Sequence, residues 1–300
     1  MTDLEFILQQ AINAISLGSL YAMVAVGLSM VFGILRMTNF AHGDMMMAGS
    51  YATVLLTVAG LPFGVAVVCG VGVSVLVGVL AERIAYRPVR GAPDVTLLLT
   101  SLALTYVLEN LAILIFSSSP RAMPLPDWMG EVYSFSDGAI TFTGIDLCAT
   151  VLALCSLLGL GWFVTRTTTG LGMRAAAEDM AATALVGLNL NRLIVTAFAI
   201  ASGFAGLAGV LWAAQSGVVD PGMGFSPLLK AFVAAIVGGF GSIAGAVMGG
   251  YLLGALEILI VGFGPPEISP YRDAIVFALL ILFLLFRPGG LMRPNREIKL

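Results

Sequence analysis

The chain has 300 residues, of which 59% are hydrophobic and only 10% are charged, and its formal net charge is −3. Soluble domains carry about 25% charged residues because their surfaces face water, so this composition excludes a soluble globular protein. Most of the surface must instead face lipid, and we expect an all-α, polytopic bundle of transmembrane helices. The beginning, MTDLEFILQQ, lacks the positive charge that starts a secretory signal, so we expect no cleaved signal peptide.

Apolar runs separated by glycine, proline and charged residues predict about eight or nine membrane segments. In chain order they lie near residues 6–34, 44–60, 62–82, 95–116, 145–165, 192–213, 227–240, 242–262 and 271–287. A helix needs about 20 apolar residues to cross the hydrocarbon core of a bilayer. Two pairs of neighbouring runs, around residues 61 and 241, have almost no linker between them. We therefore expect some of the segments to be broken or re-entrant helices.

The basic residues concentrate on one side of these segments, and Lys and Arg are typically enriched on the cytoplasmic side of a membrane. Eleven fall on one side: Arg36, Arg83, Arg87, Arg90, Arg166, Arg174, Arg192, Arg287, Arg293, Arg296 and Lys299. Three fall on the other side: Arg121, Lys230 and Arg272. This asymmetry predicts an N-terminus outside the cell and a C-terminus in the cytoplasm.

No stretch outside the membrane segments is long enough to form a domain. The longest are residues 117–144, expected on the periplasmic side, and residues 166–191, expected in the cytoplasm. Each is too short to bury a stable core of its own. We expect residues 1–300 to form one transmembrane domain, so ATP hydrolysis or capture of a soluble ligand would require partner proteins.

The polar stretch NFAHGD, residues 39–44, lies between the first two apolar runs and holds the only histidine of the chain. We interpret it as a polar break between two packed helices near a translocation pathway, lined by Asn39, His42 and Asp44. Gly43 would permit the bend. A gating role is expected here, with direct contact between His42 and substrate left open. A single histidine and three cysteines without metal-site spacing predict no catalytic or metal site.

Two carboxylates lie inside apolar runs. A charge at the centre of a membrane costs about 2.5–3.5 kcal/mol, so such a residue usually faces the interior of the bundle or a wet cavity. For Glu109 we favour a hydrogen bond between helices. For Glu257 the sequence leaves open whether the side chain lines a transport pathway or joins two helices.

Many of the 36 glycines are spaced for close contact between helices, which small residues permit in membranes. The glycine-rich stretch 238–250 lacks the Lys and Ser/Thr of a Walker loop, so it does not predict a phosphate site. The residues expected to serve packing or hinge movement are Gly43, Gly49, Gly238, Gly239, Gly241, Gly245 and Gly249.

A weak internal repeat relates FAHGDMMMAGSY (40–51) to FGSIAGAVMGGY (240–251). The matched pairs are Phe32 with Phe232, Phe40 with Phe240, Gly49 with Gly249, and Tyr51 with Tyr251. In the predicted topology both copies run in the same direction, and transporters often contain such repeats around broken helices. Chance remains the alternative, because these residue types are common in membrane helices.

The loop between residues 165 and 193 differs from the rest of the chain. Its alanine-rich sequence predicts one short helix over 173–188, preceded by Gly170 and Gly172 and ended by Gly187 with Asn189. Such a helix would lie across the membrane surface and suits docking to a soluble partner, or it merely anchors the loop. The residues expected to carry the docking are Arg174, Ala177, Glu178, Asp179, Leu185 and Gly187.

Four stretches together resemble the permease subunits of bacterial high-affinity branched-chain amino acid ABC transporters. The family's opening is similar to GSLYAMVAVGLSMVFGILRMTNFAHGDMMMAGSY (18–51), and its coupling loop to RAAAEDMAATALVGLNLNR (174–192). Its glycine-rich closing half is similar to KAFVAAIVGGFGSIAGAVMGGYLLGALE (230–257), and its ending to FRPGGL (286–291). The four occur in order along nearly the whole chain.

The resemblance implies a permease subunit of an ABC importer in the bacterial inner membrane, without an enzyme site of its own. Its partners would be a second related permease, two cytoplasmic ATPases that bind ATP and Mg²⁺, and a periplasmic substrate-binding protein, with no nucleic acid involved. The permease itself would bind no cofactor. The substrate would be a branched-chain amino acid, another amino acid, an amide or urea, and the permease pair would be homomeric or heteromeric.

Three other functions stay open as alternatives. An ion- or proton-coupled secondary transporter would use Asp44, Glu109 or Glu257, and a passive channel would use the glycine-rich stretch as a filter. A membrane enzyme has too few candidate catalytic residues. None of the three requires a docking helix in the loop.

Overall fold

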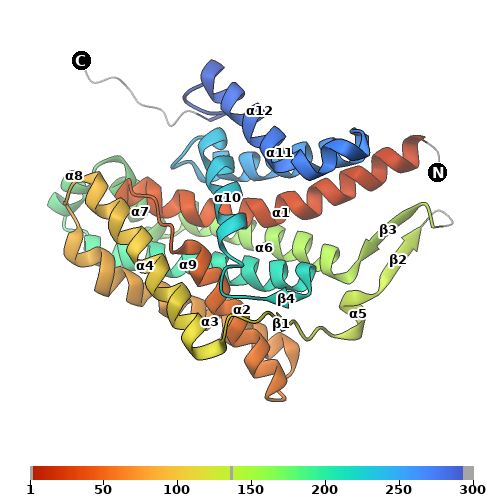
Figure 1. Cartoon of the computed structure of the whole chain (residues 1–300). Helices are drawn as coiled ribbons and strands as arrows, with labels where there is room; N and C mark the ends of the chain where they lie inside the picture. Colours follow the sequence, from red (N-terminus) through yellow and green to blue (C-terminus); the bar gives the residue numbers. More distant parts are fainter. Residues whose placement is uncertain (1–2, 136–137, 293–300) are drawn as a thin grey trace.

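The computed structural model describes residues 3–135 and 138–292, and these residues are almost entirely helical (Figure 1). The bundle is built from α1 (Asp3–Leu35), α2 (His42–Val58), α3 (Phe63–Ala81), α4 (Asp94–Phe116), α6 (Gly144–Arg166), α9 (Leu190–Ser216), α10 (Phe225–Gly238), α11 (Ile243–Phe263) and α12 (Arg272–Phe286). Each predicted apolar run forms one of these helices, with boundaries that differ by only a few residues.

Short elements join the bundle helices. They are η1 (Glu82–Tyr86), η2 (Arg87–Val89), β1 (Arg121–Ala122), α5 (Asp127–Gly130), β2 (Val132–Phe135), β3 (Ile140–Thr143), α7 (Thr168–Glu178), α8 (Met180–Leu185), β4 (Val218–Val219) and η3 (Pro266–Tyr271). Strand β2 pairs antiparallel with β3, and β1 pairs antiparallel with β4. The β2–β3 hairpin lies at one end of the bundle, the hairpin end, and α7 with α8 lies at the opposite end, the α8 end (Figure 1).

Seven helical stretches in the described chain are long and apolar enough to cross a membrane. Helices α2 and α10 are shorter, with 17 and 14 residues. At about 1.5 Å per residue they extend roughly 25 and 21 Å, less than the ~30 Å hydrocarbon core. Helices α2 and α10 are therefore too short to cross the core on their own.

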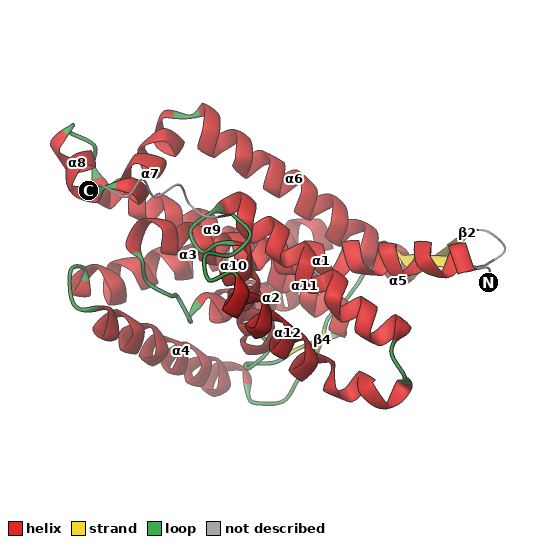
Figure 2. Cartoon of the chain, turned by 90° about the horizontal axis from the view of Figure 1, so that it is seen from above, coloured by secondary structure: helices red, strands yellow, loops and turns green. Residues whose placement is uncertain are grey.

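Helix α1 lies at the centre of the bundle and is buried without interruption from Gly18 to Val31. It runs antiparallel along α11, because Gly18 meets Gly254 while Gly33 meets Gly241. Close packing follows from these small residues, since lipid provides no hydrophobic drive between helices. Helices α4 and α6 lie at opposite edges of the bundle in Figure 2, and α12 lies at its edge in Figure 1; all three expose many of their apolar side chains.

The charge count took Lys230 as a basic residue on the outer side of the segments, and in this it was wrong. Lys230 is buried within α10, with 4% of its surface exposed. Arg293, Arg296 and Lys299 lie outside the described residues. Arg166 and Arg174, at the end of α6 and in α7, lie at the α8 end.

The matched phenylalanines of the internal repeat pack reciprocally. The rings of Phe32 and Phe240 are 3.8 Å apart between centroids, and those of Phe40 and Phe232 are 6.0 Å apart. Each phenylalanine of the first copy therefore contacts the match of the other one. Two copies that run in the same direction and are related by a twofold axis would show this exchange. The relation is local, because α1 follows α11 over most of its length, whereas α2 meets α10 near its beginning.

Candidate functional site

The two short helices begin at the same place inside the bundle. A β-carbon at Gly43 would lie 2.7 Å from the carbonyl oxygen of Gly224, and one at Gly224 would come still closer to Gly43. Only glycine at both positions allows the first turn of α2 to touch the segment that enters α10. Among the described residues neither helix is capped at its start by a side chain.

A cavity of about 260 Å³ opens beside this contact, and we call it the break cavity. It is lined by Phe40, Gly43, Asp44, Thr105, Glu109, Pro221, Gly222, Gly224, Phe225 and Leu228. Thr105 and Glu109 share a face of α4 because they are four residues apart. Asp44 comes from α2, and its surface is only 6% exposed.

Two polar side-chain atoms at the break cavity have no hydrogen-bond partner among the described residues. Asp44 Oδ2 and Thr105 Oγ1 are buried and form no hydrogen bond with any described residue. The interhelix hydrogen bond that we favoured for Glu109 is also not formed in the described part of the chain, where this side chain instead lines the cavity. A carboxylate oxygen, which accepts, and a hydroxyl, which both donates and accepts, therefore border a space that a small cation or ammonium group could occupy.

Asn39 and His42 do not join Asp44 in the break cavity, contrary to the expectation that the three line one pathway. Tyr86 donates a hydrogen bond from its hydroxyl to Asn39 Oδ1 at 2.7 Å. His42 is completely buried, and a β-carbon at Gly27 would lie 2.6 Å from its Cε1 atom. Of these three polar residues, only Asp44 lines the break cavity, whereas Asn39 packs against η1 and His42 against α1.

Glu257 lies in a separate, buried group of charges, which we call the ion cluster. Lys230 Nζ is 2.9 Å from Glu257 Oε1 and 2.9 Å from Asp273 Oδ1. Tyr21 donates its hydroxyl to the Glu257 carboxylate at 3.0 and 3.1 Å, and Arg272 Nε lies 3.9 Å from the same group. The ion cluster joins α1, α10, α11 and the start of α12, so Glu257 connects helices here.

The glycines expected to serve packing lie where helices or turns approach closely. Gly238 and Gly245 face each other between α10 and α11, and a β-carbon on either would collide with the backbone of the other. Gly49 meets α9, where a β-carbon would lie 3.0 Å from the Cα of Gly206. The others contact backbone or form the turn between α10 and α11: Gly43, Gly239, Gly241 and Gly249.

The predicted single helix over 173–188 is wrong, because the chain forms two helices that meet at Asp179. This residue is extended, and its side chain accepts a hydrogen bond from Ala182 N at 3.0 Å as the N-cap of α8. An aspartate side chain competes for backbone N–H groups in this way, and here it overrides the helix propensity of the alanines. Gly170 and Gly172 do not precede the helix but lie buried within α7.

The residues expected to carry docking are mostly exposed at the α8 end. Leu185 is 89% exposed and Val186 is 75% exposed, so the tip of α8 presents apolar side chains. Arg174, Glu178 and Asp179 are also exposed, whereas Ala177 is half-buried. Gly187 adopts a φ of +85° and turns the chain towards α9.

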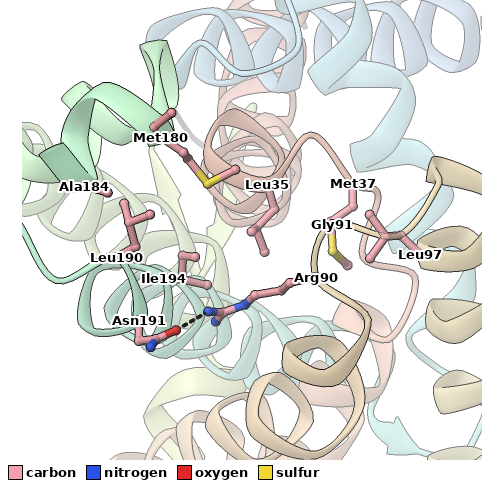
Figure 3. Close-up of a pocket in the computed structure, with 11 residues that line it drawn as sticks. Leu35, Met37, Arg90, Gly91, Leu97, Met180, Ala184, Leu190, Asn191 and Ile194 are labelled. Atoms are coloured by element: carbon pink, nitrogen blue, oxygen red, sulfur yellow. Dashed lines mark hydrogen bonds between the residues drawn. The ribbon is translucent and has the colours of Figure 1, made fainter.

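Beneath α8 lies a second cavity, of about 400 Å³, which we call the α8 cavity (Figure 3). Its wall is mostly apolar and comprises Leu35, Met37, Arg90, Gly91, Leu97, Met180, Ala181, Ala184, Leu190, Asn191 and Ile194. Arg90 donates to Asn191 Oδ1 at 2.6 Å, which ties the segment after η2 to the first turn of α9. Arg90 also forms an ion pair with the fully buried Glu82, and burial lowers the pKa of its guanidinium.

Several site residues were not identified from the sequence. Gly224 and Thr105 carry no local signal, because their roles depend on contacts with Gly43 and Asp44 far away in the chain. Lys230 did carry a signal, since a lysine within an apolar run needs a buried anion such as Glu257.

Comparison with known proteins identifies the family of this chain. The sequence profile of the family described as branched-chain amino acid transport system / permease component matches residues 10–284. The chain is 38% identical over 310 residues to the high-affinity branched-chain amino acid transport system permease protein BraD of Pseudomonas aeruginosa, covering 99% of both chains. It is also 38% identical to the corresponding permease protein LivH of Escherichia coli, over 97% of each chain.

A more distant relative is the permease protein LivM of Salmonella typhimurium, which is 28% identical over 96% of this chain and 72% of its own length. The family match spans most of the chain, and two relatives exceed 30% identity over nearly their full length. The chain is a multi-pass membrane protein that belongs to the permease component family of branched-chain amino acid transport systems.

Proposed function

We propose that the chain is a permease subunit of an ABC importer that moves branched-chain or related amino acids into the cytoplasm. The observation that carries this proposal is the exposed α8 with its apolar tip at Leu185 and Val186. Apolar side chains on a short helix outside the membrane segments suit a groove on a soluble partner. In this proposal the partner is an ATPase, and ATP-driven movement of α8 switches the permease between outward-facing and inward-facing states.

The α8 cavity supports a moving role for α8. This helix has one buried residue, Thr183, and packs chiefly against α7 and the beginning of α9. Elements with few buried contacts open and shift at low free-energy cost. Arg174, Ala177, Glu178, Asp179, Leu185 and Gly187 would form the contact with the ATPase or hold its shape.

We further propose a complex with a second permease, two ATPases and a periplasmic substrate-binding protein. The similarity to both LivH and LivM supports a related second permease chain, because those two proteins are named as permeases of the same type of system. ATP and Mg²⁺ would be bound by the ATPases. The α8 end would lie in the cytoplasm of a bacterial cell and the hairpin end in the periplasm, in keeping with the arginines near α8.

The route of the substrate would pass the place where α2 and α10 begin. Transporters often place substrate sites where discontinuous helices meet near the centre of the membrane. Asp44 would line this route directly, with Asn39 and His42 supporting the break and Gly43 allowing the contact. Glu257 would act by holding α10 and α11 together.

The test is a double variant at the α8 end. Glu178→Arg reverses a charge, and Leu185→Asp places a charge on the apolar tip. The variant should insert normally but lose the ATPase subunits during purification and lose ATP-driven leucine uptake in proteoliposomes. Asp127→Arg serves as the matched control, because Asp127 is exposed at the hairpin end and should leave ATPase binding unchanged. Leucine uptake by the variant at the wild-type rate, or uptake without ATP, would contradict the proposal and favour a gradient-driven carrier.

A further inference from the structure

We propose that the break cavity binds the amino acid in transit as a zwitterion, with its ammonium group held by Asp44, Glu109 and Thr105. This inference rests on the proposed function and adds the residues that contact substrate and the chemical group that they recognise. Neither Thr105 nor Glu109 is part of the polar break in the sequence, and both come from α4.

The first argument is the charge within the cavity. Its lining residues include two carboxylates and no lysine, arginine or histidine. Asp44 is nine-tenths buried, and its Oδ2 atom has no hydrogen-bond partner among the described residues. A buried acceptor without a donor is costly, and a ligand that supplies N–H groups removes this cost. An ammonium group brings three donors, which matches the two carboxylates and the Thr105 hydroxyl in number.

The second argument concerns the other end of a zwitterion. The first turns of α2 and α10 both reach the cavity, and neither is capped by a side chain in the described part of the chain. Several N–H groups of these turns already donate to backbone carbonyls, among them Asp44 N to Ala41 O and Phe225 N to Gly222 O. The helix starts therefore contribute mainly a partial positive charge of about half an elementary charge. A carboxylate fits there, a short distance from the carboxylates that attract the ammonium group.

The third argument is size and the nature of the remaining wall. The volume of about 260 Å³ lies just below the range of about 300–1,000 Å³ that is typical of pockets for drug-sized ligands, so it suits a smaller molecule such as leucine. Phe40, Phe225 and Leu228 form an apolar wall that suits a branched aliphatic side chain. Ions alone would leave this apolar wall without a contact.

The experiment measures binding to the full-length chain in lipid nanodiscs by saturation-transfer NMR, which detects weak ligands. The probes are L-leucine, 4-methylpentanoate, which lacks the ammonium group, and 3-methylbutylamine, which lacks the carboxylate. We expect 4-methylpentanoate to bind roughly 10- to 100-fold more weakly than leucine, because it loses charge-assisted hydrogen bonds. The amine should retain part of the affinity.

The variant Asp44→Asn should weaken leucine binding by a similar factor and remove the preference for leucine over 4-methylpentanoate. Asp94→Asn is the matched control, because Asp94 is exposed at the start of α4 and does not line the cavity. If Asp44→Asn fails to fold, Glu109→Gln applies the same test at a half-buried position. Equal binding of leucine and 4-methylpentanoate by the wild type, or unchanged leucine binding by the variants, overturns the inference.

The two levels of the proposal fail in different ways. If ATP-driven uptake by the wild-type complex proceeds while the cavity variants bind leucine normally, the transport function stands and the cavity assignment is wrong. If the wild type binds leucine with the expected preference but its uptake does not require ATP, the cavity assignment stands and the ATP-driven mechanism is wrong.

Discussion

The ion cluster allows a specific prediction, because replacing Lys230 and replacing Glu257 should lower the free energy of unfolding by different amounts. Lys230 is paired with two carboxylates at 2.9 Å each, and its side chain is 5% exposed. Lys230→Met leaves Glu257, with 2% of its side chain exposed, near only the Tyr21 hydroxyl and an arginine at 3.9 Å. Leaving a buried charge without its partner costs about 3–5 kcal/mol.

The opposite change is milder. Glu257→Gln removes the negative charge but leaves Lys230 paired with Asp273 at 2.9 Å. The glutamine can still accept a hydrogen bond from Tyr21, so we expect a loss of about 1 kcal/mol, the net value of an ordinary hydrogen bond. In the double variant no carboxylate is left unpaired at position 257, and its cost should be smaller than the sum of the single costs.

The assay is thermal unfolding of the detergent-purified chain, followed by tryptophan fluorescence. At roughly 2 °C per kcal/mol for a large domain, Lys230→Met should lower the Tm by about 6–10 °C and Glu257→Gln by about 2 °C. Equal shifts for the two single variants, or additive shifts in the double variant, would refute the view that Lys230 and Glu257 stabilise the bundle as a coupled pair.

Three further predictions concern the two ends of the proposed mechanism. Gly224→Ala should abolish uptake and lower the Tm because its methyl group collides with Gly43, whereas Gly203→Ala, with its nearest neighbour at 3.5 Å, should change neither. Asp179→Ala should destabilise α8 by about 0.5–2 kcal/mol, seen as faster hydrogen exchange over residues 180–186, while Asp179→Asn keeps the cap and the protection. Ala184→Phe should fill part of the α8 cavity and slow ATP-driven uptake without loss of the ATPases; Ala182→Phe, which does not line the cavity, is its control, and equal rates for the two would argue against a moving α8.

The helices could be predicted from the sequence because lipid leaves the backbone few choices. A chain within the hydrocarbon core must satisfy every N–H and C=O internally, so each apolar run forms a helix. The sequence also led us to expect some broken or re-entrant segments, since the runs around residues 61 and 241 have little linker. The same reasoning identified Asp44 as a residue of the break and Gly43 as a contact.

The features that could not be predicted depend on contacts between distant parts of the chain. Nothing near Gly224 indicates that it meets Gly43, and nothing near Thr105 indicates that it faces Asp44. The break at Asp179 was missed for a local reason, because alanine propensity outweighed the capping ability of aspartate in the prediction. Lys230 was counted among the basic residues outside the membrane because charge counting ignores the pairing that permits a buried lysine.

Helix α9 provides a physical connection between the α8 end and the break cavity. It begins beside α8, where Asn189 caps it, and extends over 27 residues towards the hairpin end (Figure 1). Along the way Gly209 packs so tightly on α2 that a β-carbon there would lie 2.5 Å from the Met46 carbonyl oxygen. Beyond Ser216 the chain forms β4 and returns through residues 220–224 into α10. A displacement of α9 would therefore act on both short helices, on α2 through packing and on α10 through the chain itself. Because close-packed helices do not deform continuously, such a displacement would separate or join the beginnings of α2 and α10 as units.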